Sequence, residues 1–191
     1  MSSAGPLQVV HAGRVLPAKG QHLSVDAVSR LSPEDKQRVE LHIVGRVADR
    51  PYFDQLRVAA RGQPVVFHGD VDDFDAPLRR ADLVLYPTAL HGEWPDVALR
   101  AMSWGVAVAW TDHASVREAV GGLGLPLAPG DFQALRSALS AALDDRFRLA
   151  AMGDAGRLFV EANYSWDRVG PQWDQLFDEV VCGARPLPPT R

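Results

Sequence analysis

The sequence has little of several features that mark particular classes of protein. It contains one cysteine, Cys182, in 191 residues, so no internal disulfide can form. No apolar run reaches the length of a membrane-spanning helix, and the start, MSSAGPLQ, lacks the basic and apolar regions of a signal peptide. We therefore expect a cytoplasmic protein without a transmembrane segment, in which the thiol is not a nucleophile.

An excess of positive charge is also missing. The net charge is −4, and the 20 Lys and Arg side chains are scattered along the chain. Proteins that bind nucleic acids or anionic membranes usually gather such side chains into a patch or a run. The sequence therefore argues against nucleic acid and favours small molecules or other proteins as partners.

The pattern of apolar residues predicts an α/β fold. Short apolar runs alternate with helical patterns, and the composition, 47% hydrophobic and 23% charged, fits one domain with a full core. Strands are expected at residues 8–12, 39–45, 65–69, 82–86 and 106–110, with a brief sixth strand within 121–131. This alternation predicts a Rossmann-like, doubly wound, mainly parallel sheet with helices on both faces.

Four parts of the chain can be distinguished. Residues 1–7 resemble a linker, residues 8–164 form the predicted Rossmann-like domain, residues 165–182 form a C-terminal helix, and residues 183–191 are expected to be a disordered tail. Gly170-Pro171 should break or kink the last helix, because proline removes a helical hydrogen bond.

The last helix carries one apolar stripe. Its members are Trp166, Val169, Trp173, Leu176, Phe177 and Val180. Such a stripe normally packs on the sheet of its own domain, which is what we expect here. The alternative is a helix that crosses onto another domain.

The segment Tyr86 to Gly105, YPTALHGEWPDVALRAMSWG, joins a strand end, a loop and a helix start. Pro87 should end the strand, and Pro95 is expected to be the first helical residue. Open α/β sheets bind ligands at the carboxyl ends of their strands, and the free N–H groups of a helix start suit a phosphate. A plain connection without a ligand is the alternative.

Several other groups point to structural roles. His42 and His68 alternate within predicted strands and are expected to be structural, whereas His91 and His113 lie nearer the ligand edge. The acidic turn after the third strand resembles a metal site but lacks the remaining ligands of a calcium loop. Helix capping by Asp72 or Asp73 is the more consistent role, and we expect no metal site.

Eight segments in a fixed order resemble the C-terminal, nucleotide-sugar-binding domain of retaining GT-B glycosyltransferases of the group-one, family-four type. They are GRVLPAKG, LHIVG, VVFHGDV, ADLVLYPTALHGEWPDVALRAM, GVAVAWTD, VREAV, LAPGD and SWDRV. The resemblance implies that Arg14 and Lys19 hold the donor diphosphate, although both could be plain surface charges. It also places the nucleotide base near Gly45 and against the backbone at Val71.

The same resemblance places the donor sugar over one loop, made of His91, Gly92, Glu93, Trp94, Pro95 and Asp96. In the family, this region has two acidic residues with seven residues between them. Aligning the WP and AM pairs puts Gly92 and Arg100 at the acid positions. Shifting the frame by one residue puts Glu93 and Ala101 there, so the second acid is absent in either frame.

Arg100 therefore stands where the family would contact the ribose of the donor nucleotide. A carboxylate there would accept hydrogen bonds from ribose hydroxyls, and a guanidinium has no acceptor. We expect Arg100 to pair with Asp96 at i, i+4, and a contact with a phosphate of the nucleotide is the alternative.

The resemblance implies half of an enzyme. This half would bind a nucleoside diphosphate sugar, with no metal or other cofactor, for transfer of a hexose-type sugar with retention. The catalytic base would belong to an N-terminal acceptor domain, so this chain contains no catalytic residue and should be inactive alone. A non-catalytic interaction domain with a degenerate site, or half of a GT-B-like sugar-nucleotide epimerase, are the alternatives.

Overall fold

The computed structural model describes residues 5–181 and contains one six-stranded sheet in that range. Every strand pair is parallel, and the spatial order is β3-β2-β1-β4-β5-β6. The strands are β1 (Leu7–Ala12), β2 (Val39–Val44), β3 (Val65–Gly69), β4 (Leu83–Tyr86), β5 (Ala107–Thr111) and β6 (Leu125–Leu127). This doubly wound order confirms the predicted Rossmann-like fold.

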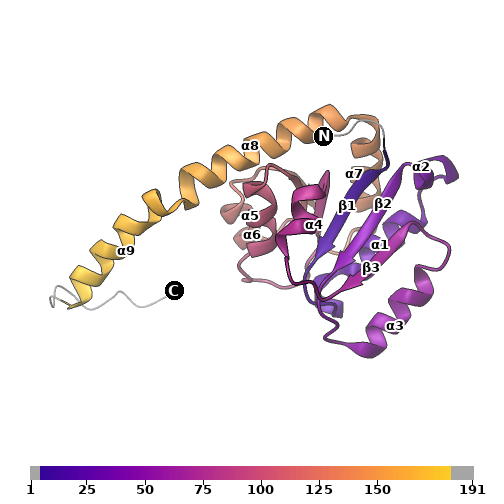
Figure 1. The fold of residues 1–191 in the computed structure, drawn as a ribbon, viewed down its shortest axis with the longest axis horizontal. Coiled ribbons are helices and arrows are strands. Elements are labelled where there is room, and N and C mark those ends of the chain that lie inside the picture. Colours follow the sequence, from indigo (N-terminus) through magenta and orange to yellow (C-terminus); the bar gives the residue numbers. More distant parts are fainter. Residues whose placement is uncertain (1–4, 182–191) are drawn as a thin grey trace.

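Helices follow the strands and lie on both faces of the sheet (Figure 1). A short 3-10 helix, η1 (Pro17–Lys19), leads into the first α-helix. The α-helices are α1 (Gln21–Ser29), α2 (Pro33–Gln37), α3 (Arg50–Ala59), α4 (Asp75–Arg80), α5 (Asp96–Ser103), α6 (Ala114–Ala119), α7 (Phe132–Asp144), α8 (Arg146–Tyr164) and α9 (Trp166–Val181). No helix in residues 5–181 is both long and apolar enough to cross a bilayer.

The sheet separates two apolar cores. One core packs α1, α3 and α7 against the side of β1 that carries Leu7 and Val9. The other packs α4, α5 and α6 against the side that carries Val10 and Ala12. Strands β4 and β5 are buried at every position, as expected for parallel strands covered on both faces.

The strand order reverses between β1 and β4, and open α/β sheets bind their ligands at the carboxyl edge of the sheet at such a reversal. The loops that follow β1 and β4 touch where the Ala89 amide donates to the Ala18 carbonyl at 2.8 Å. Gly20 lies at this contact with φ 78°, and a Cβ there would overlap the carbonyl oxygen of Pro87. Glycine is therefore required for the close approach of the loops.

The ends of the domain differ slightly from the predicted boundaries. Leu7, assigned to a linker from the sequence, is the first residue of β1 and is fully buried. At the other end, the Tyr164 hydroxyl donates to the Ala119 carbonyl at 2.8 Å and anchors the end of α8 on α6. The predicted tail, residues 183–191, and Cys182 lie outside the described residues.

Helix α9 extends away from the rest of the molecule (Figure 1). None of its residues is buried, and Trp166, Trp173 and Phe177 are 77%, 48% and 59% exposed. The expectation that the stripe packs on the domain's own sheet is therefore wrong. The chain leaves helical geometry at Ser165, between α8 and α9, and α9 continues as a helix through Pro171.

Candidate functional site

The candidate site lies where the loops after β1 and β4 meet. Lys19, the last residue of η1, is only 8% exposed although it carries a charge. Arg14 is exposed in the same turn, and its carbonyl accepts from the Gln21 side chain at 3.0 Å. The structure thus brings both predicted phosphate ligands to one edge of the sheet but buries only one of them.

A three-residue cluster surrounds the Lys19 ammonium. It donates to Glu93 Oε1, and it lies 5.9 Å from the centre of the Tyr86 ring. The Tyr86 hydroxyl donates to the other carboxylate oxygen, Glu93 Oε2, at 3.1 Å. Burial, followed by the charge of Glu93, raises the pKa of Tyr86, so its hydroxyl remains a donor at neutral pH. Both oxygens of Glu93 are therefore occupied.

The loop places Glu93, and not its neighbour, in contact with Lys19. Gly92 has φ 71°, a conformation that an acidic residue would adopt only with strain. Pro95 has φ −84° and ψ 59° and precedes the helix, so α5 starts at Asp96, one residue later than predicted. Sequence reasoning missed the role of Tyr86, although its place at the carboxyl end of β4 could have indicated it.

Aromatic side chains lie beside this loop. Trp94 is 58% exposed, and its ring meets Tyr164 edge to face, with centroids 5.8 Å apart. His91 and His113, expected near the ligand edge, have ring centroids 4.0 Å apart. His113 is buried, and its Nε2 lies 3.2 Å from the Thr88 carbonyl. Both histidines therefore lie in the loop region next to the candidate site.

Arg100 has a different partner from the one predicted. Its guanidinium binds Asp75 at 2.8 Å and lies 5.2 Å from the Phe74 ring centre. The expected pair with Asp96 is therefore wrong, because the side chain reaches from α5 across to α4. This ion pair links α5 to α4.

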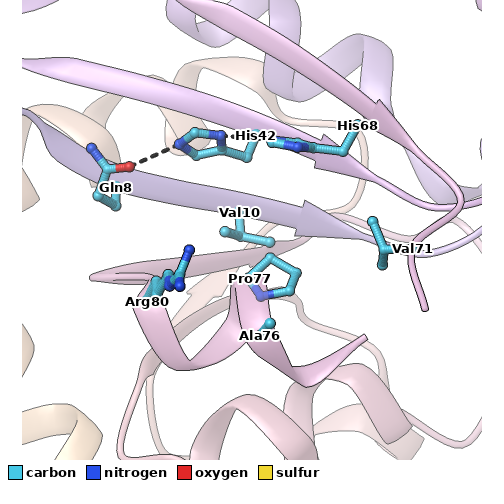
Figure 2. A pocket seen from close by; sticks show the side chains of 8 residues that line it. All are labelled: Gln8, Val10, His42, His68, Val71, Ala76, Pro77 and Arg80. Atoms are coloured by element: carbon cyan, nitrogen blue, oxygen red, sulfur yellow. Dashed lines mark hydrogen bonds between the residues drawn. The ribbon is translucent and has the colours of Figure 1, made fainter. Parts of the chain in front are cut away.

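The two positions proposed for the base, Gly45 and Val71, are in different surroundings. Gly45 has φ 138°, and a Cβ there would overlap the Gly13 carbonyl, so this glycine lets the loops after β1 and β2 approach. Val71 lines a cavity of 260 Å³ between the sheet and α4 (Figure 2).

The cavity at Val71 contains a hydrogen-bonded row of side chains (Figure 2). His42 Nε2 lies 2.8 Å from Gln8 Oε1, and His42 Nδ1 lies 2.9 Å from His68 Nε2. Arg80 extends from α4 on the opposite side. The two histidines alternate onto the same sheet face, as their strand positions indicated, but their direct contact depends on the pairing of β2 with β3.

The acidic turn has the structural role that the sequence favoured. Asp73 Oδ1 accepts from the amides of Asp75 and Ala76 at 3.0 and 3.1 Å, which confirms that Asp73 caps the start of α4. Within residues 5–181, no group of three or more His, Cys, Asp or Glu side chains could hold a metal ion.

Comparison with known proteins identifies the family. The family described as "Glycosyl transferases group 1" matches residues 6–145. A GDP-mannose-dependent monoacylated alpha-(1-6)-phosphatidylinositol monomannoside mannosyltransferase of Corynebacterium glutamicum is 33% identical in an alignment of 168 residues that covers 82% of this chain and 43% of the relative. Glycogen synthase of Mycobacterium tuberculosis is 28% identical in an alignment of 187 residues that covers 95% of this chain and 44% of the relative.

Solved structures agree on the fold. Anabaena HepE, solved in complex with UDP, has a TM-score of 0.79 at 22% identity over 90% of this chain and 48% of its own. Sucrose-phosphate synthase from Thermosynechococcus elongatus has a TM-score of 0.80 at 23% identity over 96% of this chain and 47% of its own. The chain spans about half the length of the curated relatives that it matches. It belongs to the group 1 glycosyltransferases and has the Rossmann-like fold of one half of a GT-B enzyme.

Proposed function

We propose that this chain is the donor-binding half of a glycosyltransferase and that Lys19 holds the diphosphate of a nucleoside diphosphate sugar. The observation that carries the proposal is a buried lysine at the point where the strand order reverses. A buried ammonium is costly unless it has a partner, and this one lies at the edge of the sheet where open α/β folds bind their ligands.

The names of the relatives support a diphosphate-containing donor. The Corynebacterium enzyme is described as GDP-mannose-dependent, and Anabaena HepE was solved both with UDP and with UDP-glucose. The bases and sugars of these ligands differ, whereas the diphosphate is common to all of them. A site on Lys19 therefore fits the shared part of the donor, and a hexose-type sugar is the matching substrate class.

The chemistry that we propose needs no metal ion or cofactor. As the sugar leaves, negative charge grows on the diphosphate, and Lys19 and Arg14 would stabilise it as preorganised cations. The sugar would lie over the loop from His91 to Asp96, and transfer would proceed with retention at the anomeric carbon. The catalytic base and the acceptor site would belong to an N-terminal domain outside this chain.

Helix α9 supports a partner for this half. Its exposed tryptophans and phenylalanine form an apolar face that nothing in residues 5–181 covers. Large exposed apolar patches usually mark interaction sites. We propose that the acceptor-binding half docks on this face.

A non-catalytic interaction domain is the second candidate function. It is favoured by Arg100, which replaces a ribose-binding acid and is already engaged by Asp75. In that case, the α9 face would be the functional surface and the candidate site would bind no nucleotide.

A thermal-shift screen distinguishes the two candidates. The chain would be melted with UDP, GDP and ADP, and with UDP-glucose and GDP-mannose. A ligand at 100 times its dissociation constant stabilises the folded state by about 2.7 kcal/mol, which is readily measured. Stabilisation by at least one nucleoside diphosphate is the expected result, and no shift with any of them would favour the interaction domain.

A further inference from the structure

We infer that Glu93 is an internal stand-in for the donor diphosphate, which must displace the Glu93 carboxylate from Lys19 in order to bind. This inference rests on the proposed function of Lys19. We add that the diphosphate and the Glu93 carboxylate compete for Lys19, so this competition sets the affinity of the site. Glu93 belongs to the loop that is proposed to hold the sugar.

The ion pair already satisfies Lys19 without a ligand. The Lys19 ammonium is almost fully buried, and among the described residues the Glu93 carboxylate is its partner in an ion pair. The Tyr86 ring adds a weaker attraction from 5.9 Å. A diphosphate offers Lys19 the same kind of partner, so the two anions compete for one cation.

Glu93 stands on a segment that can release it. Residues 87–95 form neither helix nor strand, and Gly92 directly before Glu93 has a positive φ. The anchors of the carboxylate are the contacts with Lys19 and the Tyr86 hydroxyl. Displacement therefore breaks side-chain contacts and requires no change in a strand or a helix.

A second place for the carboxylate exists beside the loop. A depression of 430 Å³ is lined by Glu93 and Trp94, and on the far side by Ser115, Glu118 and Tyr164. Ser115 Oγ is buried there without a hydrogen-bond partner, so it could donate to a carboxylate that swings in. Glu118 would repel it, and the contact with Lys19 is therefore preferred while the site is empty.

This arrangement makes Glu93 a specificity-determining residue. A ligand that carries a diphosphate can replace the lost counter-charge, whereas a nucleoside without phosphate cannot. A ligand that must contact Lys19 but carries no negative charge cannot displace the Glu93 carboxylate. Glu93 therefore opposes the binding of such uncharged ligands. Removing the charge of Glu93 should tighten diphosphate binding and leave nucleoside binding unchanged.

Calorimetric titration of the chain with UDP, GDP and inorganic pyrophosphate tests the inference. Glu93→Gln keeps a hydrogen-bonding side chain for Tyr86 and should bind the nucleoside diphosphates about tenfold more tightly, with pyrophosphate affected in the same direction. Glu161→Gln makes the same substitution in an exposed ion pair with Arg157 on α8, and should change affinity less than twofold. Uridine and guanosine should bind both variants as they bind the original chain.

A spectroscopic measurement shows whether the tighter binding uses the same lysine. The chain has two lysines, Lys19 and Lys36, so lysine-labelled protein gives two ammonium or side-chain signals by NMR. UDP should shift the Lys19 signal, and Glu93→Gln should shift that signal without ligand. Tyr86→Phe is a second variant, for use if Glu93→Gln folds poorly. It removes one hydrogen bond to Glu93 and should also tighten UDP binding, by a smaller factor.

The failures can be told apart. If the original chain binds UDP or GDP but Glu93→Gln and Tyr86→Phe bind with equal or lower affinity, the competition does not exist and the proposed function stands. If neither the original chain nor the variants bind any diphosphate, the proposed function and this inference are both wrong.

Discussion

At the scale of single residues, the site depends on where Lys19 lies. Replacing Lys19 by Ala should weaken binding of a nucleoside diphosphate by about 1.5 to 3 kcal/mol, the range for a hydrogen bond to a charged group. Calorimetry on Lys19→Ala measures this loss, with Lys36→Ala as the matched control that removes the same charge from α2. Equal losses in both variants would show a general charge effect, and a strict need for manganese would contradict the proposed metal-independent site.

Arg100 and Asp75 make a second residue-level prediction. Their side chains are 45% and 25% exposed, so the ion pair should contribute no more than about 1 kcal/mol to stability. Arg100→Glu places like charges together and should lower the free energy of unfolding by a similar amount. Adding Asp75→Arg should restore most of the loss, as urea unfolding of the single and double variants would show. Additive effects would mean that the two side chains do not interact in solution.

His11 should make the chain sensitive to acid. Burial lowers the pKa of His11 to about 3, and its Nδ1 lies 2.8 Å from Ser24 Oγ. The unfolded chain takes up this proton near pH 6.5, before the folded chain does. The contribution of neutral His11 to the free energy of unfolding is therefore fully present above pH 6.5. It falls by up to about 1.4 kcal/mol per pH unit as the pH drops from there toward 3.

The variant His11→Asn isolates this effect, because asparagine can still hydrogen-bond Ser24 but does not titrate. Urea unfolding at pH 7.5, 6 and 5 should show a shallower decline in the variant than in the original chain. Since other groups titrate equally in both proteins, parallel curves would show that His11 is not held neutral by the fold.

At the scale of elements, α9 is the helix whose apolar face lacks a partner among the described residues. Trp173→Asp combined with Phe177→Asp should change the free energy of unfolding by less than about 0.5 kcal/mol, as for surface substitutions. Leu139→Ala in α7, where the side chain is fully buried, should cost about 2 to 5 kcal/mol by comparison. Chemical denaturation measures both, and a large loss in the α9 variant would show that this helix packs on the domain.

At the scale of the whole molecule, a two-sided sheet domain carries one projecting helix (Figure 1). The chain covers 43% and 44% of the lengths of the two relatives described above. If the acceptor site and base lie in the other half, the purified chain should bind a donor but transfer no sugar from UDP-glucose or GDP-mannose. Multiple-turnover transfer to any acceptor, followed by product analysis, would show that the active site lies within this chain.

The sequence by itself determined the local features of this protein. The alternation of apolar strands and amphipathic helices predicted the fold, because burial on both faces demands near-continuous apolar runs in parallel strands. Asp131 caps α7 through a neighbour three positions along the chain, since its side chain accepts from the Ala134 amide at 2.9 Å. Lys19 lies in the turn that follows the first strand, and this placement likewise depends on neighbours within a few positions in the chain.

Only the tertiary structure decided which distant side chains meet. Arg100 pairs with Asp75, 25 positions away, and Glu93 reaches Lys19 across 74 positions, so helical spacing and alignment frames could not identify these partners. The direction of α9 was equally hidden, because an apolar stripe shows that a face needs a partner but not where that partner lies. Such contacts depend on how helices and loops pack around the sheet, which local patterns of hydrophobicity do not specify.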